Sequence, residues 1–232
     1  MLRALLTDVD GTITDQGRSL HTGAIEVIRE LVSRGVEVVP ASGNTACFMD
    51  ALCRMLGTLG TFIGENGGVY RVGFSGELHI LGDQPACLEA FSVVQEHYRD
   101  AGIHLQLLSP QYRYTDVAFL RIVPPEEVEK LLVGDDVLVI DTGFAIHLQA
   151  KGVNKAIAFM DLANDLGIPP GEFLAIGDAI NDIEMLGAAG IGATVSNGHP
   201  ETKAVAGYIA KNSYGDGFIE AVQEYSSHFF ER

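Results

Sequence analysis

The sequence predicts an α/β protein whose doubly wound parallel sheet is interrupted by a second, inserted α+β domain. Nearly continuous apolar strands alternate with amphipathic helices in the first third of the chain, the pattern of a parallel sheet covered on both faces. This rhythm stops near residue 81 and returns near residue 152. We therefore expect a core domain formed by residues 1–80 and 152–232, and an inserted domain formed by residues 81–151.

The first part of the core contains three expected strands, each an apolar run that ends in polar residues, at 3–9, 36–41 and 61–63. Thr22 resembles the N-cap of a first helix that ends at Gly35, with an apolar face of Ala24, Ile25, Ile28, Leu31 and Val32. A second helix carries Ala46, Phe48, Met49, Leu52, Cys53 and Leu56 and closes at Gly57. Residues 69–72 and 77–80 flank a glycine-containing turn and predict a hairpin.

The inserted domain begins with an expected helix at 85–100, whose apolar positions are Leu88, Phe91, Val94 and Tyr98. Strands are expected near 103–108 and 117–121. A short helix should start at Pro124-Pro125, because proline and the acidic residues that follow are favoured at a helix N-terminus. A closing hairpin is expected from 137–141 and 144–149.

The second part of the core resumes with Asn154 as a candidate cap for a helix over 155–166, with Ala156, Phe159, Met160, Ala163 and Leu166 inward. A strand at 172–176 and a helix from Asn181 follow. Short strands near 191–195 and 208–209 and a final amphipathic helix after Tyr214 complete the chain.

Composition excludes several classes of function. The net charge is −16 with only 15 Lys and Arg residues, so no basic surface for nucleic acid is expected. No apolar run approaches the ~20 residues of a membrane span, and the start is too short for a signal peptide, so we expect a cytoplasmic protein. Cys47, Cys53 and Cys87 lack metal-binding spacing and are expected to be reduced and mostly buried.

Polar residues collect where the predicted parallel strands end, which is where such sheets bind ligands. Alternate residues of a strand point the same way, so Asp8 and Asp10 are expected to share one side. Each residue has an ordinary structural explanation alone; their joint appearance at successive strand ends indicates a site. The set comprises Asp8, Asp10, Ser42, Gly43, Asn44, Glu65, Asn66, Gly67, Asp178 and Asp182, with Lys155 opening a helix in the same half.

This set suits phosphoryl transfer. Carboxylates without histidine or cysteine favour Mg²⁺, and one aspartate can attack phosphorus to form an aspartyl-phosphate. Lys155 and the metal would neutralise the phosphoryl oxygens, and the Ser42 hydroxyl with the N–H groups that follow it would bind them. Asp10 is the candidate for proton transfer.

The four segments resemble the motifs of the haloacid dehalogenase superfamily of Mg-dependent phosphatases, and the insertion corresponds to a C2-type cap. The segments are Asp8-Val9-Asp10-Gly11-Thr12, Ser42-Gly43-Asn44, Lys155 and Gly177-Asp178-Ala179-Ile180-Asn181-Asp182. The small cap, the Gly64-Glu65-Asn66-Gly67-Gly68 run and Asn212-Ser213-Tyr214-Gly215 are similar to the archaeal-type phosphoglycolate phosphatases.

The resemblance implies residue roles. Asp8 would be the nucleophile and a Mg²⁺ ligand, and Asp10 the acid/base that binds Mg²⁺ through its backbone carbonyl. Asp178 and Asp182 would complete the metal site. Ser42, Gly43, Asn44, Lys155 and Asn181 would hold or support the phosphate.

The resemblance further implies hydrolysis of 2-phosphoglycolate, whose carboxylate calls for a cation in the cap. Arg113 is the first candidate and Arg121 the second, whereas His147 reads as a satisfied core histidine.

Other readings remain open: a sugar-phosphate phosphatase, a phosphomutase, a phospho-accepting signalling domain or a nucleotide-binding module. Apart from a small-molecule phosphate ester no partner is implied, and the sequence leaves a homodimer open.

Overall fold

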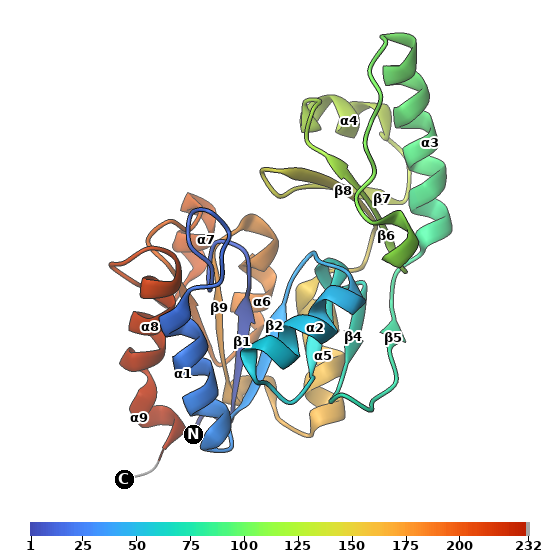
Figure 1. Cartoon of the computed structure of the whole chain (residues 1–232). Coiled ribbons are helices and arrows are strands. Elements are labelled where there is room, and N and C mark those ends of the chain that lie inside the picture. Colours follow the sequence, from blue (N-terminus) through green and yellow to red (C-terminus); the bar gives the residue numbers. More distant parts are fainter. Residues whose placement is uncertain (231–232) are drawn as a thin grey trace. The chain divides into compact units, whose positions relative to one another are not determined.

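The computed structural model describes residues 1–230, which form two units. The core unit combines residues 1–79 with the chain from 154 onward, and the inserted unit is 80–153. The division falls within two residues of the limits expected from the sequence. Figure 1 shows the elements of both units in sequence colours.

The core unit is built on an eight-stranded sheet of order β11-β10-β9-β1-β2-β3-β4-β5. The strands from β11 to β3 are parallel, and β4 runs antiparallel to β3. This confirms the predicted α/β class with a mostly parallel sheet. The strands are β1 (Ala4–Asp8), β2 (Glu37–Ala41), β3 (Phe62–Gly64), β4 (Val69–Arg71), β5 (His79–Ile80), β9 (Phe173–Gly177), β10 (Ile191–Thr194) and β11 (Tyr208–Ile209).

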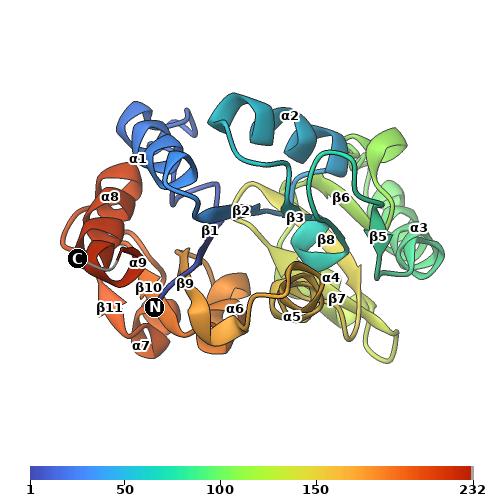
Figure 2. The ribbon, with the colours of Figure 1, turned by 90° about the horizontal axis from the view of Figure 1, so that it is seen from below.

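Helices cover both faces of this sheet. Figure 2 shows α1, α2 and α8 along one side of the strands and α5 and α6 along the other. The first face is closed by a cluster that includes Ile28 of α1, Met49 of α2 and Phe218 of α8. The core-unit helices are α1 (Thr22–Ser33), α2 (Ala46–Leu56), α5 (Lys155–Leu166), α6 (Ile183–Ala188), α7 (Pro200–Val205), α8 (Tyr214–Glu224) and α9 (Ser226–Phe229), with 3₁₀ turns η1 (Glu65–Gly67), η3 (Pro170–Glu172) and η4 (Ile180–Asp182).

The register of β1 explains how the site is placed. Asp8 lies opposite Ala41 of β2, and Thr7 lies opposite Ile176 of β9, so the three strands end at one edge of the sheet. Successive residues of a strand point to opposite faces. Leu5 belongs to the cluster beneath α1, so Asp8 points toward the other face, where α5 and α6 pack.

Several side chains face differently from the prediction. The N-cap of α1 is His21, whose Nδ1 accepts a hydrogen bond from the Ala24 N–H at 3.3 Å, and not Thr22. Phe48 and Met160 are exposed, although their spacing suggested inward positions. Cys47 is also exposed, whereas the other two cysteines are buried. Their hydrophobicity suggests that these side chains are buried, but the rotation of each helix about its axis decides which of them face the sheet.

Helix α5 offers a direct stability test. Phe159 is fully buried and meets Phe173 of β9 edge-to-face, with 4.8 Å between ring centroids. We expect Phe159→Ala to lower the free energy of unfolding by about 3–5 kcal/mol, because it leaves a cavity between helix and sheet. The neighbouring Met160→Ala should change it by less than about 0.5 kcal/mol, since Met160 is exposed. Urea unfolding of both variants measures this; equal losses would contradict the packing.

The inserted unit is a three-stranded antiparallel sheet of order β6-β8-β7 whose apolar side packs against helices. The closing hairpin was predicted correctly as β7 and β8. The elements are α3 (Gln84–Asp100), η2 (Pro110–Tyr112), β6 (Asp116–Leu120), α4 (Pro125–Leu131), β7 (Val137–Asp141) and β8 (Ala145–Ala150). Within residues 1–230, no helix combines the length and apolarity that a membrane crossing requires.

Two expectations for the inserted unit were wrong. Residues 103–108 do not form a strand: Leu107 makes one isolated bridge to Phe119, with two backbone hydrogen bonds beside it. The left-handed Ser109 (φ 51°) ends this short pairing. Leu88 is exposed, and Cys87 and Ala90 occupy the buried face of α3.

Candidate active site

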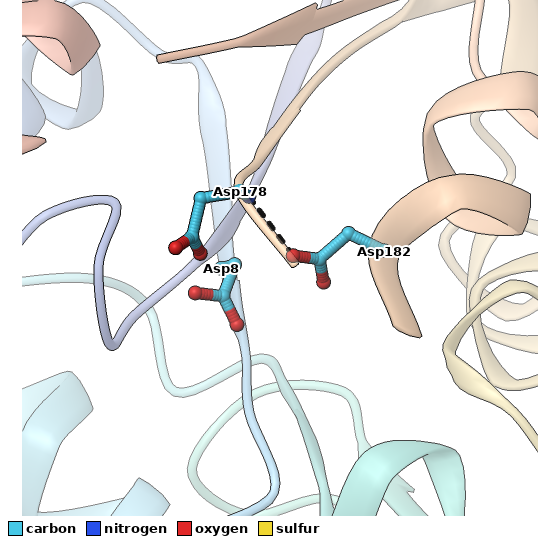
Figure 3. Close-up of side chains that lie close together, drawn as sticks. All are labelled: Asp8, Asp178 and Asp182. Atoms are coloured by element: carbon cyan, nitrogen blue, oxygen red, sulfur yellow. Dashed lines mark hydrogen bonds between the residues drawn. The ribbon is translucent and has the colours of Figure 1, made fainter. Parts of the chain in front are cut away.

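Three carboxylates meet at the carboxyl edge of the core sheet. Asp8, Asp178 and Asp182 (the carboxylate cluster) each offer an oxygen within 4.8 Å of the others. Figure 3 shows the three side chains converging from β1, the end of β9 and the following turn. Asp182 is fully buried and Asp8 is 6% exposed. The second oxygen of Asp8, Oδ2, is buried and has no hydrogen-bond partner among residues 1–230.

A tight turn after β9 brings Asp182 back beside Asp178. Oδ2 of Asp182 accepts hydrogen bonds from the N–H groups of Asp178 and Ala179, both at 3.0 Å. Gly177 leaves room for this fold-back, because a Cβ there would lie 2.6 Å from the Asp182 side chain. The four-residue spacing was therefore a sound guide to their proximity, although the turn is 3₁₀.

Lys155 supplies positive charge to the carboxylate cluster. Asn154 caps α5 as predicted, its Oδ1 accepting the N–H of Ile157 at 2.8 Å, and this cap places Lys155 in the first turn. The Lys155 ammonium donates to Asp8 Oδ1 and Asp182 Oδ1, each at 2.6 Å, and the side chain is 1% exposed. Burial alone would lower the pKa of Lys155, but the charges of Asp182 and Asp8 outweigh it and raise that pKa, so the lysine stays cationic.

One lysine does not balance three carboxylates. Burial raises the pKa of Asp8 well above its usual range, opposed by the charge of Lys155 and reinforced by the charges of Asp182 and Asp178. Burial, with the charge of Asp182, raises the pKa of Asp178 to about 7. Such shifts mark carboxylates that would be stabilised by a further cation. Clustered carboxylate oxygens are the donors that Mg²⁺ prefers, so these residues fit that ion.

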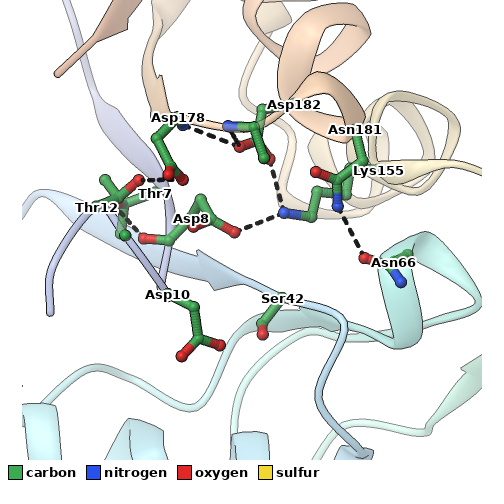
Figure 4. A network of polar contacts seen from close by, with 12 residues as sticks. Thr7, Asp8, Asp10, Thr12, Ser42, Asn66, Lys155, Asp178, Asn181 and Asp182 are labelled. Carbon is green, nitrogen blue, oxygen red and sulfur yellow. Dashed lines mark hydrogen bonds and ion pairs between the residues drawn. The ribbon is translucent and has the colours of Figure 1, made fainter. Parts of the chain in front are cut away.

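Asp10 lies outside the carboxylate cluster. Strand β1 ends at Asp8, and the Asp10 carboxylate instead accepts a hydrogen bond from Asn44 Nδ2 at 3.1 Å. The same Nδ2 donates to Ser42 Oγ at 2.9 Å, so Asn44 joins two of the predicted site residues. Figure 4 shows Asp10 and Ser42 below Asp8, on the side opposite Asp178. Asp8 and Asp10, which were expected to share one side, therefore lie in two different environments.

The glycine-rich turn after β3 connects the remaining segments. Asn66 Oδ1 accepts a hydrogen bond from Asn181 Nδ2 at 3.0 Å (Figure 4), and the Asn66 N–H donates to the Ser42 carbonyl at 3.1 Å. Gly43 must lack a side chain because a Cβ there would lie 2.9 Å from the Asn66 amide. Gly67 likewise lies against the Asn154 carbonyl, where a Cβ would approach to 2.1 Å. This turn thus joins the Ser42, Lys155 and Asn181 segments.

Sequence reasoning missed three supporting side chains. Thr12 Oγ1 donates to Asp178 Oδ1 at 3.3 Å, and Asn197 Nδ2 donates to the Gly11 carbonyl at 2.8 Å. Arg18 donates to the Asp10 carboxylate from the loop after β1. Thr12 lies in the first recognised motif and could have been singled out there. Asn197 and Arg18 sit in loops without periodic spacing, so the sequence carries no signal for them.

Arg113 has a partner inside the inserted unit. Its guanidinium donates to both oxygens of Asp116, at 2.7 and 2.9 Å, and its Nε donates to the Leu108 carbonyl at 3.0 Å. The Arg113 side chain is 6% exposed, and Asp116 is fully buried. His147 Nδ1 lies 2.7 Å from Asp116 Oδ2, which confirms the prediction of a satisfied core histidine. A substrate carboxylate would have to compete with Asp116 for Arg113.

The second candidate cation, Arg121, is paired as well. Its Nε donates to both oxygens of Asp141, at 2.8 and 3.0 Å, on the surface of the inserted unit.

The Asp116 network predicts acid sensitivity. Burial alone would raise the pKa of Asp116, but the hydrogen bond from His147 and the charge of Arg113 outweigh it, so the pKa lies below its usual value. The ionised form therefore adds stability that is present above the unfolded pKa of about 3.9 and is lost as the pH falls through the folded pKa. Asp116→Asn should remove this part of the acid dependence, and at neutral pH it should cost about 3–5 kcal/mol by leaving Arg113 without its charged partner.

Urea unfolding from about pH 7 down to about pH 2 measures both effects. Asp100→Asn, which changes an exposed carboxylate of the same unit, is the matched control and should follow the wild type. An Asp116→Asn profile with the wild-type slope and stability would show that the network does not stabilise the fold.

Comparisons with known proteins identify the family of this chain. A family model described as haloacid dehalogenase-like hydrolase matches residues 5–117 and 124–222. A protein of Methanoculleus marisnigri named phosphoglycolate phosphatase is 54% identical over 234 residues, covering 100% of both chains. A phosphoglycolate phosphatase of Methanospirillum hungatei is 47% identical, again over 100% of both chains.

The solved structures include a Thermoplasma acidophilum protein, designated 0175, that superposes with a TM-score of 0.86. It is 27% identical, and the match covers 97% of this chain and 99% of that one. The fold, the grouped motif residues and these relatives lead to one conclusion: the chain belongs to the haloacid dehalogenase-like hydrolase family.

Proposed function

We propose that this chain is a Mg²⁺-dependent phosphatase that hydrolyses 2-phosphoglycolate to glycolate and phosphate. The observation that carries the proposal is the buried contact of Lys155 with Asp8 and Asp182 beside Asp178, an acidic site with one fixed cation. The names of the 54% and 47% identical relatives support the choice of substrate.

Asp8 is the proposed nucleophile. One of its carboxylate oxygens attacks phosphorus, the bond from phosphorus to the ester oxygen breaks, and an aspartyl-phosphate forms on Asp8. The leaving alkoxide takes a proton from the Asp10 carboxyl and departs as the alcohol. The Oδ2 atom of Asp8 supports this role, since within the described part of the chain it makes no hydrogen bond that would have to break before it attacks.

In the second step Asp10 accepts a proton instead of donating one. Water attacks phosphorus as Asp10 removes one of its protons, and the bond between phosphorus and the Asp8 oxygen breaks. Phosphate leaves, Asp8 regains its carboxylate, and Asp10 is again protonated. The position of Asp10 supports this division of roles. Its carboxylate lies outside the carboxylate cluster and is held there by hydrogen bonds from Asn44 and Arg18.

The remaining residues bind charge. Asp8, Asp178 and Asp182, with the backbone carbonyl of Asp10, would hold Mg²⁺, which when bound neutralises charge on the phosphoryl group. Lys155 would share that task as a fixed cation. Ser42 Oγ already accepts hydrogen bonds from Asn44, so its own hydroxyl hydrogen is available to a phosphoryl oxygen.

A panel of phosphate monoesters tests the proposal. We expect Mg²⁺-dependent release of phosphate with a kcat/KM for 2-phosphoglycolate at least about tenfold above those for hexose phosphates. A preference for hexose phosphates would favour a sugar-phosphate phosphatase instead. Isomerised product without free phosphate would indicate a phosphomutase, and activity undiminished by exhaustive chelation would refute the metal requirement.

A further inference from the structure

We propose that Arg18 is a positioning residue for the proton-transfer carboxylate of Asp10. The inference rests on the proposed phosphatase function, in which Asp10 gives a proton to the leaving alcohol. It concerns a loop residue that belongs to none of the motif segments, eight positions after Asp10 in the chain.

The contacts fix the Asp10 carboxylate from two sides. Arg18 Nε and Nη2 donate to Oδ1 of Asp10 at 3.1 and 3.0 Å. Asn44 Nδ2 donates to the other oxygen, Oδ2, at 3.1 Å. With one donor group on each oxygen the carboxylate plane cannot rotate freely. Oδ1 accepts two hydrogen bonds and Oδ2 only one, so Oδ2 keeps a lone pair on which a proton can be carried to or from a reacting oxygen.

The conformation of the loop places the Arg18 guanidinium beside the Asp10 carboxylate. Arg18 has a φ of 66°, the left-handed region that few residues other than glycine adopt. The conformation is enforced by the turn around it: the Arg18 N–H donates to the Asp15 carbonyl at 3.0 Å, and the Asp15 N–H to the Ser19 carbonyl at 2.8 Å. The Ser19 N–H also donates to Asp15 Oδ1 at 2.9 Å. Unfavourable backbone geometry that its surroundings enforce is found preferentially at functional sites.

Stability does not account for the pair. The side chains of Arg18 and Asp10 are 40% and 35% exposed, and ion pairs in such positions contribute little to folding. Asp10 also precedes Gly11, whose φ of 89° marks a sharp turn, so its carboxylate lies beyond the strand that fixes Asp8. The strand does not orient the Asp10 carboxylate, whereas the two hydrogen bonds from the Arg18 guanidinium do.

The dependence of the rate on the leaving group distinguishes a residue that positions Asp10 from one that binds the substrate or only supports the fold. An alkoxide leaving from 2-phosphoglycolate or ethyl phosphate needs the proton of Asp10, whereas p-nitrophenolate leaves without one. We therefore compare Arg18→Ala, Arg18→Asn and wild type on these three esters, reading the first turnover of p-nitrophenyl phosphate as released nitrophenolate. Asparagine tolerates left-handed backbone, so Arg18→Asn removes the guanidinium while keeping the loop. Gln16→Ala, an exposed change in the same loop, is the control.

Both Arg18 variants should lose about 10-fold or more in kcat on the two alkyl phosphates, out of the roughly 10²–10⁴ that proton transfer contributes. Their nitrophenolate release should change by less than about threefold. Loss confined to 2-phosphoglycolate would mean that Arg18 binds the substrate carboxylate, and equal loss or no loss on all three esters would also overturn the inference. If the wild type hydrolysed none of the esters, the proposed function would have failed first.

Discussion

Asp8→Asn should abolish turnover while leaving the fold at least as stable as the wild type. The amide has the same shape but cannot form the acyl-phosphate, so we expect kcat to fall on the order of 10⁴-fold or more. Burial and the charges of Asp182 and Asp178 disfavour an ionised Asp8, so a neutral side chain relieves repulsion in the carboxylate cluster. Steady-state kinetics and thermal unfolding without Mg²⁺ measure the two effects.

The matched control is Asp161→Asn, which removes an exposed carboxylate of α5 and should retain wild-type activity and stability. Full activity in Asp8→Asn would remove Asp8 from the mechanism. Loss of activity together with unfolding would show that Asp8 is needed for the structure, contrary to the electrostatics of the carboxylate cluster.

Lys155→Met should damage both stability and activity. Methionine fills a similar volume but leaves Asp8 and Asp182 buried without their cation, which costs about 3–5 kcal/mol for comparable buried pairs. The pKa of Asp8, already raised by burial, would rise further without the charge of Lys155, so the variant should regain stability as the pH is lowered and Asp8 protonates. With less charge stabilisation of the transferred phosphoryl group, kcat should fall by at least about 10²–10³-fold.

Urea unfolding across pH, with and without Mg²⁺, separates these contributions. Lys211→Met, at an exposed position in the core unit, should behave as the wild type. A Lys155→Met protein of unchanged stability at neutral pH would contradict the picture of a lysine that balances buried carboxylates.

The grouping of distant residues was predictable because the topology was predictable. Apolar runs of parallel-strand type predict that Asp8 and Asp178 lie at the carboxyl ends of parallel strands, which meet at one edge of the sheet. The structure adds that these strands, β1 and β9, are neighbours. The four-residue spacing from Asp178 to Asp182 requires only one tight turn. Lys155 followed from the cap at Asn154, since capping fixes where α5 begins.

Side-chain partners were less predictable, because they depend on loop conformation and helix rotation. Arg113 was a reasonable choice for a substrate cation, but its distance from Asp116 is set by the turn before β6. The Arg18 contact with Asp10 depends on a left-handed residue that no spacing indicates. Residues 103–108 have strand-like composition, yet pairing with β6 is limited to one bridge by the turn at Ser109.

The most direct test of the account is to identify the residue that carries the phosphoryl group. Asp10→Asn should still accept phosphate from p-nitrophenyl phosphate, which needs no proton, but should hydrolyse the aspartyl-phosphate slowly and so accumulate it. Acid quenching, digestion and mass spectrometry then locate the group. The proposed mechanism predicts one hydroxylamine-sensitive phosphoryl group on the peptide that contains Asp8, absent when Asp8→Asn is added. A phosphoryl group on any other residue, or nitrophenolate release without a phosphorylated enzyme, would contradict it.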